Sequence, residues 1–400
     1  MLKMQGKAII KISPSSALID EDIKVLIEGL HPSVDITLMC RVKEQTFRYF
    51  SWAYYTSDEK GCVDLTTMSA LPGGSYDGLE PMGFVWSQKQ EPGQKPGCRL
   101  VKHDVTTPLV TRFYALQGLM DPNEGLQSVN SGHWLAHTLY ERSYMADGVK
   151  RIEVRDGRLV GTLFIPSVIY FFSGNYVSHY CFAKDKDLIQ EGIQYLLGHP
   201  RVRKPFVGII GVSKGGELAL LISSLCHQIR ACVEINGMDM VTLVGCTYKG
   251  ETFPCFFADV EHIRETNEGL FMRDVYSHVT PEEYKKCSIP VERGQCDYLL
   301  IHSGDDQSMT PIATERIPKR LEHNHKSNYG VLMYPEAGHL IEPPYSPHFY
   351  STYHSLFNNL TVWGGTGKVH NRAQQDAWRE VLHFFRSKLV DKVQYLQNKL

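Results

Sequence analysis

The sequence predicts a β-rich domain followed by an α/β domain with a doubly wound, mostly parallel sheet. Three observations support this fold class. Short apolar runs punctuated by glycine and proline fill the chain to about Tyr144. Beyond about Lys150, apolar strands alternate with segments of helical periodicity, which favours a parallel sheet covered by helices. Within that second part, residues 211–215 read Gly-Val-Ser-Lys-Gly between an apolar run and a helix-like segment, a pattern typical of a sharp strand-to-helix turn.

The first domain, expected over residues 1–145, is predicted to be a β-sandwich. Residues 23–27 and 34–40 are strand-sized apolar segments, and residues 46–55 are rich in aromatic side chains. Turn signals such as residues 58–61 lie between these segments. Short strands with regular glycine and proline punctuation are typical of a sandwich. Nothing in this domain indicates catalysis.

The second domain, expected over residues 146–400, is predicted to alternate strands and helices. The expected elements are a strand at 168–172, a helix at 187–197, a strand at 207–210, a helix from Glu217, strands at 231–235, 298–301 and 331–334, and a last helix from about Gln374. The apolar face of that last helix, which extends to Leu396, is expected to pack against the core rather than a membrane or partner.

Ser213 is the predicted nucleophile. It lies at the centre of the Gly-x-Ser-x-Gly pattern, with an apolar strand before it and a helix after it. That context favours a nucleophile elbow over a glycine-rich turn with an idle serine. Gly211 and Gly215 are expected to be glycine because a side chain at either position would collide with the neighbouring strand or helix.

A serine nucleophile needs a base and a carboxylate that orients the base. His339 follows the strand expected at 331–334, and Asp305 and Asp306 follow the strand expected at 298–301. Loops at the carboxyl ends of parallel strands converge, so these groups can meet Ser213. Asp306 is favoured as the acid because the loop then turns back at Met309 and Pro311, while its neighbour is expected to order the loop.

Acyl transfer also needs two donors for the developing oxyanion. The backbone N–H of Lys214, directly after the nucleophile, is one candidate. The other is expected in the Ser-Gly-Asn loop that follows residues 168–172, at Gly174. The side chain of Lys214 is a candidate contact for substrate phosphates, the alternative being a solvated lysine.

Composition excludes several classes of function. The 400 residues carry a formal net charge of −2 with no basic stripe, so we expect no nucleic-acid partner. No apolar run approaches the roughly 18–20 residues that span a bilayer. Ten cysteines show no Cys-x-x-Cys pair and no Cys/His metal spacing, which argues for reduced thiols in an intracellular compartment and against structural zinc. We expect no metal and no organic cofactor.

Long motifs spread over nearly the whole chain carry a family resemblance. They lie at residues 79–83, 100–105, 161–164, 211–217, 234–237, 248–252, 338–345 and 363–365. They resemble the acyl-CoA thioesterases related to bile acid-CoA:amino acid N-acyltransferase. The resemblance implies an N-terminal β-sandwich on a C-terminal α/β-hydrolase domain, and a triad at Ser213, Asp306 and His339. It also implies hydrolysis of fatty acyl-CoA thioesters or acyl transfer to glycine or taurine.

The nucleophile favours one branch of this family. The conjugating acyltransferase carries cysteine at the elbow, whereas this chain has Ser213. An acyl group on serine is an oxygen ester, which water hydrolyses. We therefore favour an acyl-CoA thioesterase over an N-acyltransferase. A relative that binds acyl-CoA with weak or no turnover is a further alternative, although it would have no chemical reason to keep all three triad residues.

One region departs from the family pattern. About thirty residues, comprising one helix and one sheet strand, are absent between the loop at Gly174 and the helix expected at 187–197. Losing an interior strand leaves unpaired backbone groups, each costing about 1–3 kcal/mol if buried. Two explanations remain open: a splice form or gene model that skips a segment, or a divergent protein with a repacked sheet.

The compartment is expected to be the cytoplasm or the peroxisome. The chain ends in Asn398-Lys399-Leu400, which matches the last two positions of the Ser-Lys-Leu peroxisomal signal. The alternative is an ordinary helix end.

Overall fold

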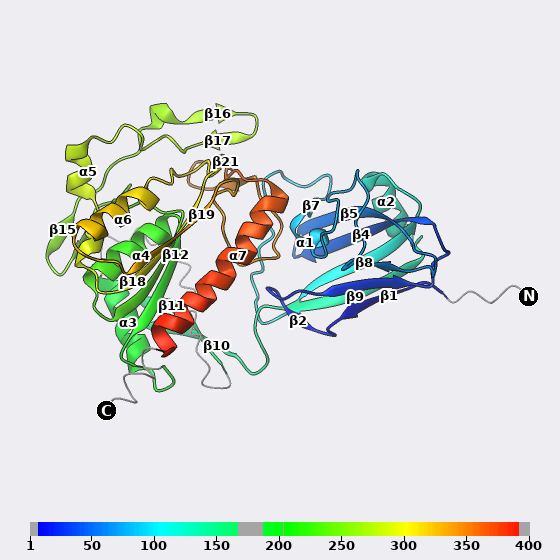
Figure 1. The fold of residues 1–400 in the computed structure, drawn as a ribbon, viewed down its shortest axis with the longest axis horizontal. Coiled ribbons are helices and arrows are strands. Elements are labelled where there is room, and N and C mark those ends of the chain that lie inside the picture. The colour runs from blue at the N-terminus through cyan, green and yellow to red at the C-terminus, as the bar shows by residue number, and fades with distance from the viewer. Residues whose placement is uncertain (1–6, 167–186, 203, 392–400) are drawn as a thin grey trace, which may run out of the picture. The chain divides into compact units, whose positions relative to one another are not determined.

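The computed structural model describes residues 7–166, 187–202 and 204–391 (Figure 1). The chain folds into two compact units, Met1–Ala146 with Pro343–Thr352, and Asp147–Glu342 with Tyr353–Leu400. The short return of the chain to the first unit is well anchored, because Tyr345 is buried in that unit's core and its hydroxyl donates to Asp22. The sequence did not indicate this return.

The first unit is built on two sheets. Its strands are β1 (Ile9–Ser13), β2 (Ala17–Leu18), β3 (Lys24–Glu28), β4 (Asp35–Glu44), β5 (Phe47–Thr56), β6 (Val63–Asp64), β7 (Lys89–Gln90), β8 (Leu109–Gln117) and β9 (Ala136–Ser143). The strand orders are β1-β3-β6 and β2-β9-β8-β4-β5-β7. β2 pairs with β9 in a short parallel contact, and the neighbouring strands β1 and β3, β3 and β6, β4 and β5, β4 and β8, β5 and β7, and β8 and β9 pair antiparallel. The strands expected at 23–27, 34–40 and 46–55 are confirmed as β3, β4 and β5.

Strand β4 is buried on both of its faces. Alternate side chains of a strand point to opposite faces, and Leu38 and Cys40 join the core shared by the two sheets. Met39, between them, joins a second cluster with Leu126 and Val129 of helix α2 (Pro122–Asn130). The other helix of this unit is the single turn α1 (Gly83–Trp86). Both faces of the larger sheet are therefore covered.

The second unit contains the predicted parallel sheet. Its strands are β12 (Val207–Val212), β13 (Ile229–Ile235), β18 (Asp297–Ser303) and β19 (Tyr329–Tyr334), in the order β12-β13-β18-β19. All three pairings are parallel. The strands expected at 207–210, 231–235, 298–301 and 331–334 are thus confirmed.

Helices cover both faces of this sheet. Helices α3 (Asp187–Gly198), α4 (Lys214–Leu225) and α6 (Ala313–His323) share one apolar cluster with one face. Helix α7 (Gly367–Phe385), drawn in red in Figure 1, shares another cluster with the other face and continues as the π-helical turn Arg386–Asp391. A parallel sheet between two helical layers is the architecture of an α/β-hydrolase domain.

Helix α7 begins earlier than expected. Its first turns bury polar side chains instead of apolar ones, and His370 illustrates why. The His370 Nδ1 accepts from the Gly338 N–H at 3.0 Å, and its Nε2 lies 2.9 Å from the Leu340 carbonyl oxygen. Because a polar turn carries no apolar periodicity, the sequence placed the start about seven residues late, near Gln374. The expected apolar residue Leu396 lies outside the described residues.

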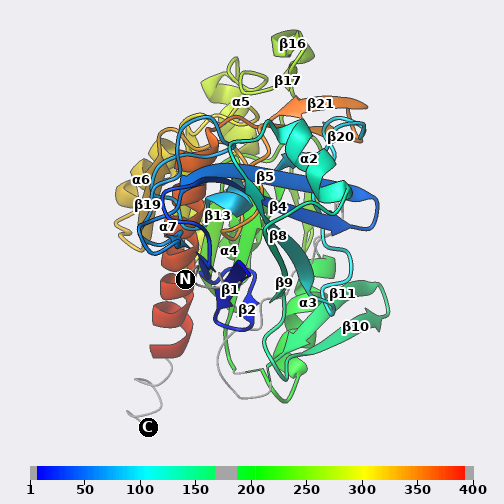
Figure 2. The ribbon, with the colours of Figure 1, turned by 90° about the vertical axis from the view of Figure 1, so that its right-hand side faces the viewer.

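Strand β12 lies at the edge of the four-stranded sheet within the described part of the chain. Its Ile210 is 40% exposed. The strand expected at 168–172 and the loop with Gly174 fall outside the described residues. Strands β10 (Lys150–Asp156) and β11 (Leu159–Ile165) form a separate antiparallel hairpin, which packs beside α3 in both views (Figures 1 and 2).

A long excursion connects β13 to β18. Its elements are β14 (Cys246–Tyr248), β15 (Glu251–Phe253), the 3-10 turn η1 (Val260–His262), β16 (Arg264–Thr266), β17 (Gly269–Phe271), helix α5 (Pro281–Cys287) and the 3-10 turn η2 (Val291–Arg293). Strands β16 and β17 form a small sheet with β20 (Ser351–His354) and β21 (Asn359–Val362), in the order β16-β17-β21-β20. The excursion has its own apolar cluster. None of the described helices is long and apolar enough to cross a membrane.

Candidate active site

Ser213 occupies a strained turn between β12 and α4. Its backbone has φ 58° and ψ −126°, a left-handed conformation that a residue with a Cβ rarely adopts. The turn is held on both sides: the Ser213 N–H donates to the Ile235 carbonyl at 2.7 Å, and the Ser213 carbonyl accepts from Gly216 at 2.9 Å. The predicted strand-turn-helix context of the serine is therefore confirmed.

The two glycines of the pattern are not equivalent. A Cβ at Gly211 would lie 2.0 Å from the Gly215 carbonyl oxygen, as the collision argument expected. At Gly215 the expected collision is not found among the described residues, since no atom outside its chain neighbours and its own helix backbone lies within 4 Å of a Cβ there. The tight position is the next residue, Gly216, whose Cβ would lie 3.2 Å from the Glu234 carboxylate and the Ile235 carbonyl oxygen.

Gly211→Ala and Gly215→Ala form a matched pair that tests this packing. We expect Gly211→Ala to lower the free energy of unfolding by at least about 3 kcal/mol, because backbone rather than a flexible side chain must move. Gly215→Ala replaces a glycine within α4 and should raise stability by at most about 1 kcal/mol. Urea unfolding of both purified variants checks this, and equal losses would contradict the geometry.

Asp306 and His339 form a buried pair. The Asp306 Oδ2 lies 2.6 Å from the His339 Nδ1, and both side chains are 1% exposed. The other carboxylate oxygen, Oδ1, accepts the backbone N–H groups of Ser308 and Met309 at 2.7 and 2.8 Å. The His339 ring stacks on Trp363 with 5.3 Å between centroids. These contacts fix both the carboxylate and the plane of the imidazole.

Asp305 has a different environment from its neighbour. Its Oδ2 accepts the Gly365 N–H at 2.8 Å, and its Oδ1 accepts from the Gln307 amide at 2.6 Å. Asp305 therefore orders the loop, as the sequence predicted, and Asp306 is the carboxylate that faces the histidine.

Asn236 connects the ends of the sheet strands, and the sequence argument missed it. It follows β13 with φ 49°, and its side-chain amide donates to the Ser303 hydroxyl at 3.0 Å and to the His339 carbonyl at 2.7 Å. Its Oδ1 accepts the Ser303 N–H at 2.8 Å. Since Ser213 bonds to Ile235, the residue before Asn236, this side chain links the elbow strand to the loop that carries the histidine.

Arg273 is a second missed residue. It comes from the segment after β17, and its Nη1 donates to the Gly304 carbonyl at 2.7 Å and the Asp306 carbonyl at 3.1 Å. The excursion thereby holds the acid loop from outside the sheet. A hydrogen bond between residues so far apart in the chain has no local signal in the sequence.

Glu234 and His302 form a second buried pair beneath the site. The Glu234 Oε2 lies 2.7 Å from the His302 Nε2, and its Oε1 accepts the Gly237 N–H. Burial alone would lower the pKa of His302, but the adjacent Glu234 carboxylate raises that pKa above its ordinary value.

This pair makes stability depend on pH in a defined direction. A histidine whose pKa is raised by folding contributes stability that is complete below its unfolded pKa of about 6.5 and is lost as pH rises through the folded pKa. Glu234→Gln should therefore lower the free energy of unfolding by about 3 kcal/mol near pH 6, and by less near pH 9. Urea unfolding of Glu234→Gln and wild type at several pH values measures this difference. Glu251→Gln is the control, because Glu251 forms an exposed ion pair with Arg293, and its loss should change the free energy of unfolding little. A loss that grows with pH would contradict the assignment.

Lys214 has separate backbone and side-chain roles. As the first residue of α4, its backbone N–H has no acceptor within the helix. Its ammonium, however, donates to the buried Glu217 carboxylate and to the Thr242 carbonyl at 2.6 Å. The Lys214 ammonium is therefore paired within the protein rather than simply solvated, and its contact with substrate phosphates stays a prediction. Burial raises the pKa of Glu217, and the Lys214 charge opposes that shift.

Together these residues can support acyl transfer. A strained, half-buried serine lies at the start of a helix, where backbone N–H groups and the helix dipole favour an oxyanion. The carboxylate holds the imidazole so that Nδ1–H donates to it, which leaves the Nε2 lone pair to act as a base. The other candidate oxyanion residue, Gly174, lies outside the described residues.

Comparison with known proteins identifies the family. A model described as "Acyl-CoA thioester hydrolase/BAAT N-terminal region" matches residues 20–156. A second, described as "BAAT / Acyl-CoA thioester hydrolase C terminal", matches residues 187–391. Together they cover most of the chain.

Individual relatives align over nearly their whole length. Acyl-coenzyme A thioesterase 1 of Rattus norvegicus is 35% identical over 412 residues, covering 93% of this chain and 94% of the relative. Its Homo sapiens counterpart is 34% identical over 409 residues, covering 92% and 94%. The peroxisomal succinyl-coenzyme A thioesterase of Mus musculus is 30% identical, covering 92% and 93%.

The alignment lengths carry a further observation. Since 93% of this 400-residue chain is about 372 residues, about 40 of the 412 positions aligned with the rat protein face gaps in this chain. The two family models, the relatives aligned over nearly their whole length and the motifs around the elbow all indicate the same family. The chain belongs to the acyl-CoA thioesterase and bile acid-CoA:amino acid N-acyltransferase family.

Proposed function

We propose that the chain hydrolyses acyl-CoA thioesters with a Ser213–His339–Asp306 triad. The observation that carries this proposal is the buried 2.6 Å contact of Asp306 with His339 in loops that follow β18 and β19. Asn236 links that histidine to the strand beside the elbow. Relatives that are 30–35% identical are named acyl-CoA thioesterases.

The reaction proceeds in two halves. His339 takes the proton from the Ser213 hydroxyl, and the Ser213 oxygen attacks the thioester carbonyl carbon. The tetrahedral intermediate collapses, the carbon–sulfur bond breaks, and His339 returns the proton to the departing CoA sulfur. Water, deprotonated by His339, then attacks the carbonyl carbon of the serine ester. The bond from that carbon to the Ser213 oxygen breaks, His339 returns the proton to this oxygen, and the free acid leaves. Asp306 stabilises the imidazolium in both halves.

Two backbone groups complete the oxyanion site in this proposal. The Lys214 N–H at the start of α4 is one donor. The N–H of Gly174 is assigned as the second by its position after an expected strand. The paired Lys214 ammonium is not needed for this role, because the backbone donates.

A second candidate reaction is N-acyl transfer to an amino acid. The matching family is described by the name BAAT as well as by acyl-CoA thioester hydrolase. Serine at position 213 favours hydrolysis, because an oxygen ester is a poorer acyl donor to an amine than a thioester. A third candidate is a catalytically weak acyl-CoA-binding relative, which the loss of a helix–strand unit proposed below would favour.

We propose that the chain lacks one helix–strand unit before the elbow. Two observations support this: the roughly 40 gapped positions in the alignment with the rat relative, and the edge position of β12, with Ile210 40% exposed, among the described residues. A skipped exon or a wrong gene model would produce the same chain, as would divergence. Sequencing the transcript across residues 180–187 separates these origins.

The remaining proposals concern domains and compartment. Residues 1–145 are proposed as the N-terminal β-sandwich, and 146–400 as the catalytic domain. A cytoplasmic or peroxisomal location is proposed from the C-terminal Lys399-Leu400 and from the peroxisomal relative of Mus musculus.

Product analysis tests the proposed reaction. The purified chain is incubated with acyl-CoAs of several chain lengths, with and without glycine or taurine, and both thiol release and acyl products are measured. Free acid and CoA in equal amounts, unaffected by the amine, support hydrolysis. N-acyl amino acid would identify the transferase, and bound acyl-CoA without thiol release would identify the non-catalytic relative.

A further inference from the structure

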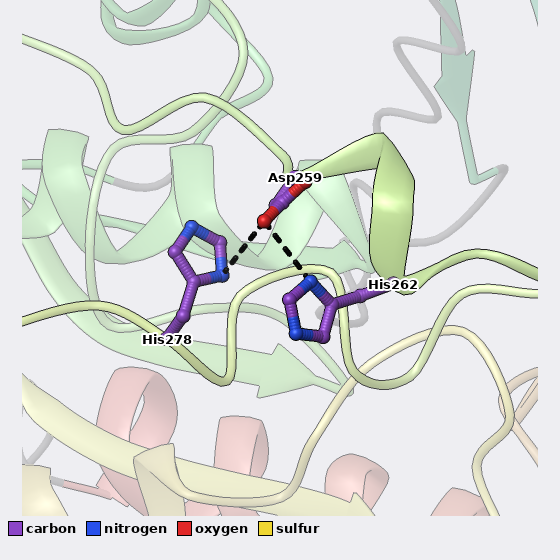
Figure 3. Close-up of side chains that lie close together, drawn as sticks. All are labelled: Asp259, His262 and His278. Carbon is purple, nitrogen blue, oxygen red and sulfur yellow. Dashed lines mark hydrogen bonds and ion pairs between the residues drawn. The ribbon is translucent and has the colours of Figure 1, made fainter.

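Asp259, His262 and His278 bring three side chains that can bind a metal ion together on the excursion (Figure 3). The Asp259 Oδ2 lies 3.0 Å from the His262 Nδ1 and 3.9 Å from the His278 Nδ1. One ligand atom from each residue lies within 4.8 Å of the others. Figure 3 shows both imidazoles turning a ring nitrogen toward the same carboxylate oxygen.

The local fold holds these side chains in place. Asp259 is the N-cap of η1, and its Oδ1 accepts the Glu261 N–H at 3.0 Å, so that Oδ2 faces the histidines. The Asp259 N–H donates to the Val275 carbonyl at 2.9 Å, which joins η1 to the segment that carries His278. The two imidazole rings stack with 5.2 Å between centroids and 15° between planes.

Hydrogen bonding to Asp259 explains the position of His262 but not that of His278. The distance of 3.0 Å permits a hydrogen bond from His262 to the carboxylate, whereas 3.9 Å for His278 is too long for one. Two imidazoles stacked over a carboxylate also repel each other if both are protonated. A bound cation removes this conflict, because it accepts a lone pair from each neutral ring and from the carboxylate.

We propose that Asp259, His262 and His278 form a binding site for a zinc-like first-row transition-metal ion. Zinc bonds to nitrogen and oxygen at about 2.0–2.2 Å, so tetrahedral ligand atoms lie roughly 3.3–3.5 Å apart. The distances from the Asp259 Oδ2 to the two Nδ1 atoms, 3.0 and 3.9 Å, lie just below and just above that spacing. Imidazole ligands favour zinc, copper, nickel and cobalt over magnesium and calcium. The fourth position is left to water, since His262 and His278 are exposed.

The charges around the site are compatible with a divalent ion. The pKa of Asp259 is lowered, chiefly by the hydrogen bond from the Glu261 N–H and further by the two histidines, so its carboxylate is ionised at neutral pH. Glu283 at the start of α5 also interacts with His278. Two imidazoles and one carboxylate therefore offer three ligand atoms to a dication.

The sequence did not predict this site. Its ligands are separated by two and by fifteen residues, a spacing that matches no local metal motif, and the expectation from the sequence was that no metal binds. Folding of the excursion brings His278 back to η1. A bound metal ion would connect the two ends of residues 259–278. The same segment contains Arg273, which donates a hydrogen bond to the Gly304 carbonyl in the loop that carries Asp306.

Cobalt titration of the untagged, chelator-treated full chain tests the site. One equivalent of Co²⁺ should bind with a visible absorption band and be displaced by Zn²⁺, whereas Mg²⁺ and Ca²⁺ should not displace it. His278→Gln and Asp259→Asn should each weaken binding at least about tenfold. Asparagine keeps the helix cap, so the second variant should keep its fold.

His133→Gln, which removes an exposed histidine of the first unit, is the matched control and should leave binding unchanged. Circular dichroism of each variant shows whether the fold is retained. Absence of stoichiometric cobalt binding by the wild-type chain, or binding that survives both His262→Gln and His278→Gln, would overturn the proposal. Acyl-CoA hydrolysis is measured in parallel, and its presence or absence does not decide the metal site.

Discussion

Ser213→Ala is expected to lower kcat/KM for acyl-CoA hydrolysis by roughly 10⁴-fold or more. The substitution removes the hydroxyl oxygen of the strained elbow at the start of α4, without adding bulk to the turn. Water would have to attack the thioester directly, without a covalent intermediate. Thiol release from acyl-CoA, followed continuously at saturating and at low substrate, measures both kcat and KM.

The triad assignment also predicts how two substitutions combine. His339→Ala should cause a loss similar to that of Ser213→Ala, and the double variant should be no worse than either, because the residues act as one unit. Ser277→Ala serves as a control, since the Ser277 hydroxyl donates to the Asp274 carbonyl in the excursion. More than a tenth of the wild-type activity in Ser213→Ala would show that another group is the nucleophile.

Much of the site could be predicted from the sequence because its parts carry local signals. The elbow combines glycine spacing with an apolar strand and a helix, and the structure places β12 and α4 around Ser213. Asp306 and His339 each follow a strand of the same parallel sheet, so the rule that carboxyl ends converge was sufficient to bring them together.

The remaining contacts could not be predicted because they join distant polar groups. Asn236 and Arg273 act through hydrogen bonds to backbone carbonyls in loops far along the chain. The buried polar start of α7 at His370 gives no apolar periodicity. The requirement for glycine at Gly216 rather than Gly215 depends on where the Glu234 side chain packs, which no spacing rule contains.

The two adjacent aspartates allow a direct test of the acid. Asp306→Asn is expected to lower kcat by about 10⁴-fold with little change in KM. The Asp306 Oδ1 accepts the N–H groups of Ser308 and Met309, so the amide oxygen of an asparagine should take that place. Its NH₂ group would then face His339 and donate to Nδ1. The proton of the imidazole would move to Nε2, where it blocks removal of the Ser213 proton.

Asp305→Asn changes the neighbouring carboxylate by the same two atoms and is the matched control. Asp305 bonds to Gly365 and Gln307, and an asparagine can accept from Gly365 in the same way, so we expect activity within about threefold of wild type. Steady-state kinetics of both variants, with thermal unfolding to verify the fold, measure the contrast. Inactive Asp305→Asn beside active Asp306→Asn would assign the acid to Asp305. A large loss in both would mean that the loop, rather than one carboxylate, sets the position of His339.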